Sequence, residues 1–205
     1  MHMIKAVVFD LGKVLVDFDY GIAGRKIAAR ATMVAGDLGR FLVHVPLITR
    51  YETGLLTSQE FYEEVRRASG FLGDMEEFAS LFADIFTPIE PMVGLQSELR
   101  GLGFPTYIFS NTNELAIRFV RRNFPFFQNF DGYILSYEHR SMKPEARLYE
   151  VVESQSGCRG DEILYLDDRP ENIEAGAARG WQVILQESPE RSRTMIQQLG
   201  LLNHR

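Results

Sequence analysis

The stretch Ile4-Lys5-Ala6-Val7-Val8-Phe9-Asp10-Leu11-Gly12-Lys13 decides the fold of this chain. Residues 6–9 form an unbroken apolar run rich in β-branched side chains, which predicts a strand buried on both faces, as in a parallel sheet. The run ends in the carboxylate of Asp10. Because open α/β sheets bind their ligands at the carboxyl ends of their strands, Asp10 is the first candidate for a working residue.

The composition is that of an ordinary globular protein: 205 residues, of which 45% are apolar and 24% are charged. A net charge of −6 argues against a broad nucleic-acid surface. No apolar run is long enough to span a membrane, and no signal peptide is visible. The single cysteine, Cys158, excludes an internal disulfide. We therefore expect a cytoplasmic monomer or homodimer with no nucleic-acid or membrane partner.

The region from Asp17 to Thr87 is predicted to be a bundle of amphipathic helices without strands. Within it, Thr57 and Glu60 fit a capping box that opens a helix, and Gly70 is placed to end that helix. A further helix is expected from Asp74 to Phe86, because its apolar residues recur at helical spacing. Glu52, Arg50 and His44 are the polar residues of this region that we note: the first two face either a ligand or solvent, and His44 is expected to pack inside the bundle.

From Pro91 onward, predicted helices alternate with predicted strands, which implies a parallel sheet. The strands are expected at 105–109, 131–135, 163–166 and 182–185, and the helices at 92–100, 113–123, 144–154 and 170–179, with a last helix opening at 188–189. Pro144 is expected at the first position of its helix. The prediction is an α/β fold: a doubly wound, Rossmann-like core (1–16 and 89–205) with an inserted helical-bundle cap (17–88).

Polar and charged residues stand at the carboxyl ends of three predicted strands: Asp10, Ser110 and the pair Asp167-Asp168. Since these ends lie on one edge of a parallel sheet, the three carboxylates are expected to meet and to need a cation. Mg²⁺ suits such oxygen ligands beside a phosphate. Lys143 and the helix N-termini that follow it and Ser110 would attract an anion. This combination suits phosphoryl transfer, with Asp10 as a nucleophile that forms an aspartyl-phosphate.

The chain resembles the haloacid dehalogenase (HAD) superfamily in four motifs that occur in the family's order and spacing. They are Phe9-Asp10-Leu11-Gly12-Lys13-Val14-Leu15, Phe109-Ser110-Asn111-Thr112-Asn113, Met142-Lys143-Pro144-Glu145 and Leu166-Asp167-Asp168-Arg169-Pro170-Glu171-Asn172-Ile173. The helical region is similar to the family's four-helix cap. Within the family, the motifs resemble a bacterial subgroup of phosphatases acting on glucose 1-phosphate.

The resemblance implies a metal site and its neighbours. Asp10 would be both the nucleophile and a ligand of Mg²⁺. The backbone carbonyl of Gly12 and the carboxylate of Asp168 would be further ligands. Asp167 would bind the metal or lie beside it, and Asn172 matches a nearby position that often holds Asp.

The resemblance also implies a phosphate site. Ser110 and Asn111 would bind the transferring phosphoryl group, next to the backbone at Gly12. Lys143 would neutralise charge and pair with Asp10. Asp10, Lys143 and Ser110 would thus be the catalytic residues, acting on a small phosphorylated substrate.

The chain departs from the family pattern at Gly12, where most family phosphatases carry an Asp that acts as general acid and base. General acid–base help is worth about 10²–10⁴-fold, so its loss is a real deficit. The glucose 1-phosphate subgroup also has Gly there. Our hypothesis is that an anomeric phosphate, whose leaving oxygen is a hemiacetal oxygen, depends less on protonation.

Two alternatives to a phosphatase stay open. In a 2-haloacid dehalogenase, Asp10 would attack carbon instead of phosphorus; that chemistry needs no metal, so the pair Asp167-Asp168 speaks against it. The second alternative is a catalytically inactive protein that binds a phosphorylated ligand, which Gly12 suggests.

Overall fold

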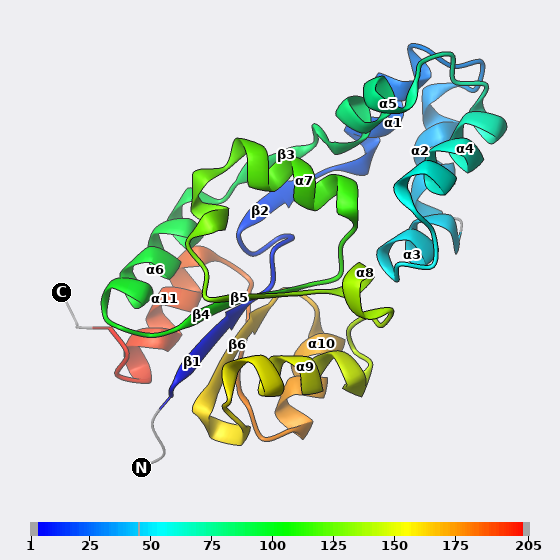
Figure 1. Cartoon of the computed structure of the whole chain (residues 1–205). Helices are drawn as coiled ribbons and strands as arrows, with labels where there is room; N and C mark the ends of the chain where they lie inside the picture. Colours follow the sequence, from blue (N-terminus) through cyan, green and yellow to red (C-terminus); the bar gives the residue numbers. More distant parts are fainter. Residues whose placement is uncertain (1–3, 45, 203–205) are drawn as a thin grey trace.

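The computed structural model describes residues 4–44 and 46–202. Its centre is a five-stranded, fully parallel sheet in the order β5-β4-β1-β6-β7 (Figure 1). The strands are β1 (Ala6–Phe9), β4 (Thr106–Ser110), β5 (Gly132–Leu135), β6 (Ile163–Asp167) and β7 (Gln182–Leu185). The α/β fold with a parallel sheet is thus confirmed.

The first strand lies in the middle of the sheet, and the chain builds outward from it in both directions. Phe9 pairs with Ile108 of β4 on one side and with Leu166 of β6 on the other. The strand order therefore reverses at β1, which makes its carboxyl end the topological switch point of the sheet. Asp10 follows β1 directly and sits at this point.

Helices cover both faces of the sheet (Figure 1). One face is packed by α6 (Glu90–Gly101), α7 (Glu114–Asn123) and α11 (Pro189–Gln198). The other face is packed by α9 (Ala146–Ser156) and α10 (Pro170–Ala178). Val7 and Phe9 belong to the first core, whereas Ala6 and Val8 belong to the second, so β1 is buried on both faces as its apolar run predicts. Short segments complete this part: α8 (Ser136–His139), η1 (Pro125–Gln128) and η2 (Gly160–Glu162).

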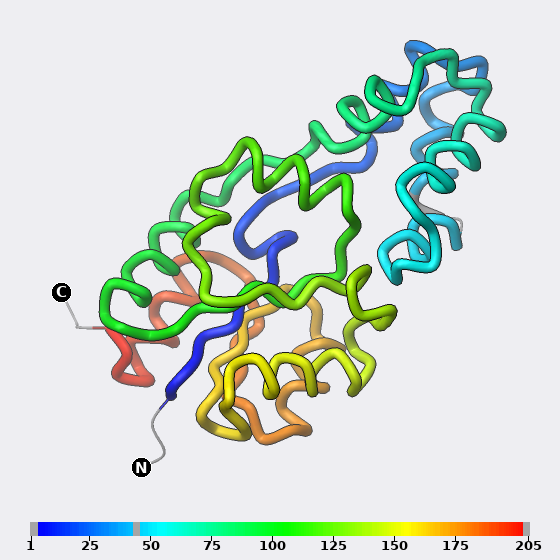
Figure 2. The backbone as a smooth tube through the Cα atoms, viewed as in Figure 1, coloured from blue at the N-terminus to red at the C-terminus, as the bar shows by residue number. Residues whose placement is uncertain are grey.

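A separate group of helices projects from the sheet, and Figure 2 shows its backbone path. It comprises α1 (Tyr20–Ala28), α2 (Ala35–His44), α3 (Pro46–Glu52), α4 (Ser58–Ser69) and α5 (Met75–Ala83). These helices enclose their own apolar cluster, in which stacked and edge-on aromatic rings such as Tyr51, Phe61, Phe78 and Phe82 dominate. The expected packing of the His44 side chain lies outside the described residues.

The prediction of a strand-free region from Asp17 to Thr87 was wrong. Two short strands, β2 (Val16–Phe18) and β3 (Phe86–Pro88), pair antiparallel where the chain leaves the core and returns to it. Val16 faces Pro88 in this ladder, so the sequence-based boundary at 16/17 falls inside it and the boundary at 88/89 falls at its end. Strands of three residues are too short to show the alternation that would reveal them. The division into core and cap remains a prediction.

Two expected helix boundaries also need correction. The helix expected to reach Phe86 ends at Ala83, because the chain turns there into β3. The helix expected to begin at Pro144 begins two residues later, at Ala146, with Glu145 as its N-cap. None of the helices in the described ranges is both long enough and apolar enough to cross a bilayer.

The capping box of α4 has the predicted form and gives a direct test of the helical region. The Thr57 hydroxyl accepts from the Glu60 amide, while the Glu60 carboxylate accepts from the Thr57 amide, and Gly70 ends the helix at φ 68°. Replacing Thr57 by Ala leaves a helix-end amide without its acceptor, so we expect a loss of about 1 kcal/mol in the free energy of unfolding.

Urea denaturation followed by circular dichroism measures this loss. Thr57→Ser keeps the acceptor oxygen and is expected to retain most of the stability. Equal stability of Thr57→Ala and the unmodified protein would contradict the role of the cap.

Candidate active site

The carboxylates of Asp10, Asp167 and Asp168 converge at the switch point, with ligand oxygens all within 4.8 Å of one another. Neighbouring strands β1 and β6 bring them together, because Asp10 directly follows β1 and Asp167 ends β6. Burial, opposed by Lys143 but reinforced by the other two carboxylates, raises the pKa of Asp10 to about 7. Burial and the charge of Asp167 also raise the pKa of Asp168. The cluster is therefore a concentrated negative charge in a poorly solvated place.

The ammonium of Lys143 lies inside this cluster. Its Nζ is 3.0 Å from Oδ1 of Asp10 and 2.6 Å from Oδ2 of Asp167, and it donates to the carbonyl of Phe109 at 2.8 Å. The side chain is buried. Burial alone lowers the pKa of Lys143, but the charges of Asp10 and Asp167 outweigh it and hold the pKa above its usual value. Lys143 is thus a permanent cation.

Asn111 fixes the position of Lys143. Its side-chain amide donates to the backbone carbonyl of Lys143 at 3.0 Å, and its Oδ1 accepts from the backbone amide of Lys143 at 2.8 Å. The side chain expected to bind a phosphoryl group is therefore occupied in joining the loop after β4 to the loop that carries the lysine. Ser110, in contrast, ends β4 as expected and is buried at this edge of the sheet.

Asp167 is the most heavily bonded carboxylate of the cluster. Oδ2 accepts from Lys143, from the hydroxyl of Tyr165 and from the side-chain amide of Asn172. Oδ1 accepts from the backbone amide of Arg169 at 2.9 Å and from Asn172 at 3.0 Å. Lys143 and these donors lower the pKa of Asp167 even though its burial raises it. Its oxygens are already satisfied, which favours a supporting position over direct metal binding.

Gly12 faces the aromatic ring of Phe18 from strand β2. A Cβ atom built on Gly12 would lie 2.8 Å from Cε1 of Phe18, a distance shorter than carbon atoms tolerate. The place where most of the family carries an acid is therefore filled by an apolar ring. The ring of Phe18 occupies the space that a side chain at position 12 would need. An acid at this position would therefore require Phe18 to move.

The net charge and the carboxylate oxygens of the cluster fit a divalent cation. Three carboxylates and one ammonium leave two formal negative charges, which one divalent cation would balance. Hard carboxylate oxygens at this spacing are the ligands that Mg²⁺ accepts. The raised pKa values of Asp10 and Asp168 have the cause that a cation would remove: burial beside other negative charges.

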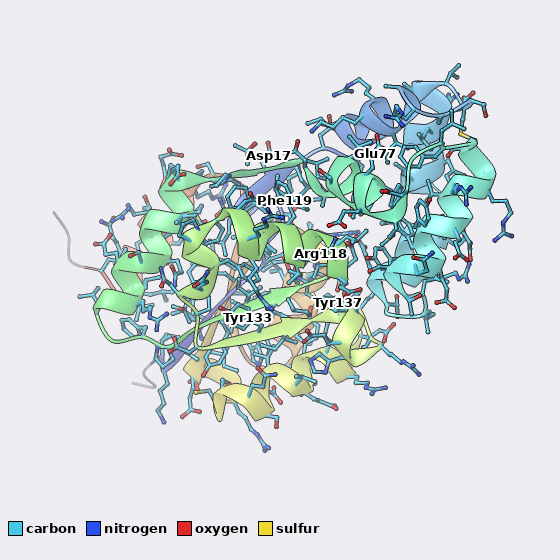
Figure 3. All side chains as sticks on the ribbon, turned by 45° about the horizontal axis from the view of Figure 1, so that its top comes forward. Asp17, Glu77, Arg118, Phe119, Tyr133 and Tyr137 are labelled. Carbon is cyan, nitrogen blue, oxygen red and sulfur yellow. The ribbon has the colours of Figure 1, made fainter. Side chains whose placement is uncertain are left out.

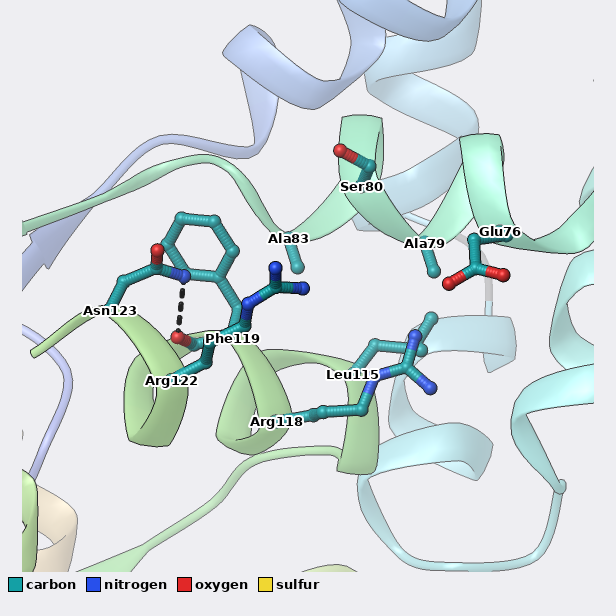
Figure 4. Close-up of a pocket in the computed structure, with 9 residues that line it drawn as sticks. All are labelled: Glu76, Ala79, Ser80, Ala83, Leu115, Arg118, Phe119, Arg122 and Asn123. Atoms are coloured by element: carbon teal, nitrogen blue, oxygen red, sulfur yellow. Dashed lines mark hydrogen bonds between the residues drawn. The ribbon is translucent and has the colours of Figure 1, made fainter.

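A separate groove of about 630 Å³ runs between α5 and α7 (Figure 4). Its lining includes Arg118, Phe119 and Arg122 from α7, opposite Glu76 and Ser80 from α5. Figure 3 shows Arg118 and Phe119 on α7, above the sheet. The groove therefore lies between the projecting helix α5 and helix α7, and none of the three clustered carboxylates lines it.

Two residues of the site escaped the sequence analysis. Tyr165 stands two positions before Asp167, so both side chains point to the same face of β6, and that period of two was the available signal. Phe18 reaches Gly12 only because β2 folds back over the loop after β1. No local sequence pattern reports such a contact.

Residues 4–180 match the family model described as haloacid dehalogenase-like hydrolase. The chain is 24% identical over 211 aligned positions to a D-ribitol-5-phosphate phosphatase of Bacteroides thetaiotaomicron, with 98% of each chain covered. It is 26% identical over 179 positions to a sesquiterpene phosphatase of Aspergillus oryzae, with 86% of each covered.

The fold is also similar to a solved HAD family enzyme of Bacteroides thetaiotaomicron in complex with magnesium and inorganic phosphate. The TM-score is 0.79 at 23% identity, over 88% of this chain and 93% of that one. This likeness extends through both the sheet and the projecting helices, as its coverage requires.

The raised pKa of Asp10 predicts how stability depends on pH when Mg²⁺ is removed. Between the ordinary pKa of 3.8 and the folded value of about 7, the folded chain holds a proton that the unfolded chain releases. The free energy of unfolding therefore falls as the pH rises through this window. At pH 8 in EDTA, we expect Asp10→Asn to be more stable than the unmodified protein by roughly 1–3 kcal/mol, or a few degrees in Tm.

Thermal denaturation at pH 5 and pH 8 measures the effect. Asp37→Asn, at an exposed carboxylate that pairs with Arg40, is the matched control and is expected to change stability by less than about 0.5 kcal/mol. A loss of stability in Asp10→Asn at pH 8 would show that the ionised carboxylate of Asp10 does not destabilise the folded protein.

Proposed function

Because the chain belongs to the haloacid dehalogenase-like hydrolases, we propose that it is a Mg²⁺-dependent phosphatase of small phosphorylated metabolites, with sugar phosphates as its substrates. The observation that carries this proposal is the buried lysine between two members of a three-carboxylate cluster at the switch point. The two relatives, which are phosphatases, and the solved neighbour with magnesium and phosphate support the same activity.

In this proposal Asp10 is the nucleophile. Its carboxylate oxygen forms a bond to phosphorus while the bond from phosphorus to the ester oxygen breaks, and the alcohol leaves with a proton from water. Water then attacks the aspartyl-phosphate, releasing inorganic phosphate and restoring the carboxylate. Lys143 neutralises charge beside Asp10, and Ser110 at the end of β4 holds the phosphoryl oxygens.

Asp10, Asp168 and the backbone carbonyl of Gly12 would hold Mg²⁺, which when bound offsets the charge of the phosphoryl oxygens. We assign Asp167 to a supporting role, because its oxygens already accept from Lys143, Tyr165, Asn172 and Arg169. It holds the ammonium in place rather than binding the metal. This assignment differs from a direct ligand role for Asp167, which the sequence left open.

The first test is release of phosphate from p-nitrophenyl phosphate. We expect turnover that requires Mg²⁺, stops in EDTA and falls by at least about 10³-fold in Asp10→Asn, because that change removes the nucleophile. Asp37→Asn, away from the site, is the matched control and should retain full activity.

The same assay separates the alternatives. Halide release from a 2-haloacid that survives EDTA would identify a dehalogenase. Phosphate binding without turnover of any phosphate monoester in a broad panel would identify an inactive binding protein.

The ring of Phe18 over Gly12 leads to a second test, on the type of ester. Without a side-chain acid at position 12, a leaving oxygen that departs readily without a proton is favoured. We expect kcat/KM for glucose 1-phosphate to exceed that for glucose 6-phosphate by about tenfold or more. Coupled phosphate assays on both esters measure the ratio. A clear preference for the primary ester, the type named for the ribitol relative, would reject this hypothesis.

A further inference from the structure

The groove between α5 and α7 is a cavity that the proposed chemistry does not use. Its volume of about 630 Å³ falls within the roughly 300–1,000 Å³ that is usual for small-molecule sites. One wall, α7, packs on the sheet, whereas the other wall, α5, belongs to the projecting helices. Neither Lys143 nor Ser110 lines the groove, so it is separate from the candidate active site.

Two arginines of α7, Arg118 and Arg122, line this groove. They are four residues apart, which makes them neighbours on one face of the helix. Both are exposed, and Figure 4 shows both side chains on the side of α7 that faces α5. Like charges at this spacing repel each other and weaken a helix. An anion held between the two guanidinium groups would remove that repulsion.

The acids near the groove do not neutralise these arginines. Glu114, one turn before Arg118, accepts from the hydroxyl of Ser58. Glu77 of α5 pairs with Arg30 at 2.8 Å. Within the described ranges, no acid forms an ion pair with either of the two arginines. Glu76 is the one acid in the lining, so the lining keeps a net positive charge.

Arg121, on the same helix, has a different role. Its guanidinium lies 5.7 Å from the ring centroid of Phe127 and 5.8 Å from that of Tyr133. These rings provide a cation–π environment, and Arg121 does not line the groove. Arg121 is therefore explained by packing, whereas Arg118 and Arg122 are not.

The remaining lining of the groove is largely apolar. Leu115, Ala79 and Ala83 present buried hydrocarbon to it. The half-buried ring of Phe119 is held by Phe86, with 6.2 Å between the ring centroids. This surface suits the apolar body of a ligand, and a guanidinium group suits a carboxylate or a phosphoryl group.

We propose that the groove between α5 and α7 is a second ligand site, which binds a small organic dianion with an apolar body. Arg118 and Arg122 hold the two negative charges, and the apolar lining covers the body. Two carboxylates or one phosphoryl group supply the same charge. This inference does not depend on the phosphatase function.

Isothermal titration calorimetry on the full chain in EDTA at pH 8 tests the site. The probes are phthalate, which carries two carboxylates, and phenylphosphonate, which carries a phosphoryl group. We expect saturable binding of at least one of them, and the one that binds identifies the anionic group. Benzoate, with the same ring and a single charge, is expected to bind about tenfold more weakly than phthalate.

Substitutions locate the binding. Arg118→Gln and Arg122→Gln each remove one charge-assisted contact, so we expect the affinity for the bound dianion to fall about tenfold in each. Glu76→Gln removes the opposing charge and is expected to raise the affinity about threefold, an increase that damage to the fold does not produce. Arg121→Gln, the matched control, removes the same charge from α7 outside the groove and should leave the affinity unchanged.

Three results would overturn the proposal. The first is the absence of saturable binding of both dianions. The second is an equal loss of affinity in Arg121→Gln, which would show that net charge alone attracts the probe. The third is binding that Arg118→Gln and Arg122→Gln leave unchanged, because the dianion would then lie elsewhere. The phosphatase function stands or falls separately, through the release of phosphate from p-nitrophenyl phosphate.

Discussion

The contact on which the site depends is the buried ammonium of Lys143 between Asp10 and Asp167. A charge out of water is stable only when its partners are placed well, and leaving such a charge with no opposite charge at all typically costs about 3–5 kcal/mol. The carbonyl of Phe109 and the side chain of Asn111 complete its surroundings. The lysine thereby ties the ends of β1, β4 and β6 to one loop, and the geometry of the cluster follows from that constraint.

The same constraint separates the two acids of the pair Asp167-Asp168. The first is satisfied by Lys143, Tyr165 and Asn172, and its pKa is lowered; the second has fewer partners, and its pKa is raised. Adjacent residues on a strand end point in different directions, so one can support the lysine while the other faces a ligand. Two neighbouring carboxylates can therefore serve different purposes without any difference in residue type.

The sequence was sufficient to predict the sheet and the residues that gather at its edge. Buried strands give continuous apolar runs, and the parallel topology brings the ends of those strands together. It was insufficient where short or distant contacts decide the outcome. The three-residue ladder β2–β3 shows no periodicity, and the ring of Phe18 over Gly12 depends on that ladder. The two hydrogen bonds between Asn111 and the backbone of Lys143 join residues 32 positions apart, and residue type alone does not predict such a contact. The domain boundaries and the roles of the site residues remain predictions.

The ladder also connects the chemistry to the projecting helices. Phe18 lies in β2, and Tyr20 begins the helix that follows, so one short segment places a ring over Gly12 and a hydroxyl on Glu52. Both contacts therefore depend on this one segment, which carries the chain from the sheet into the projecting helices.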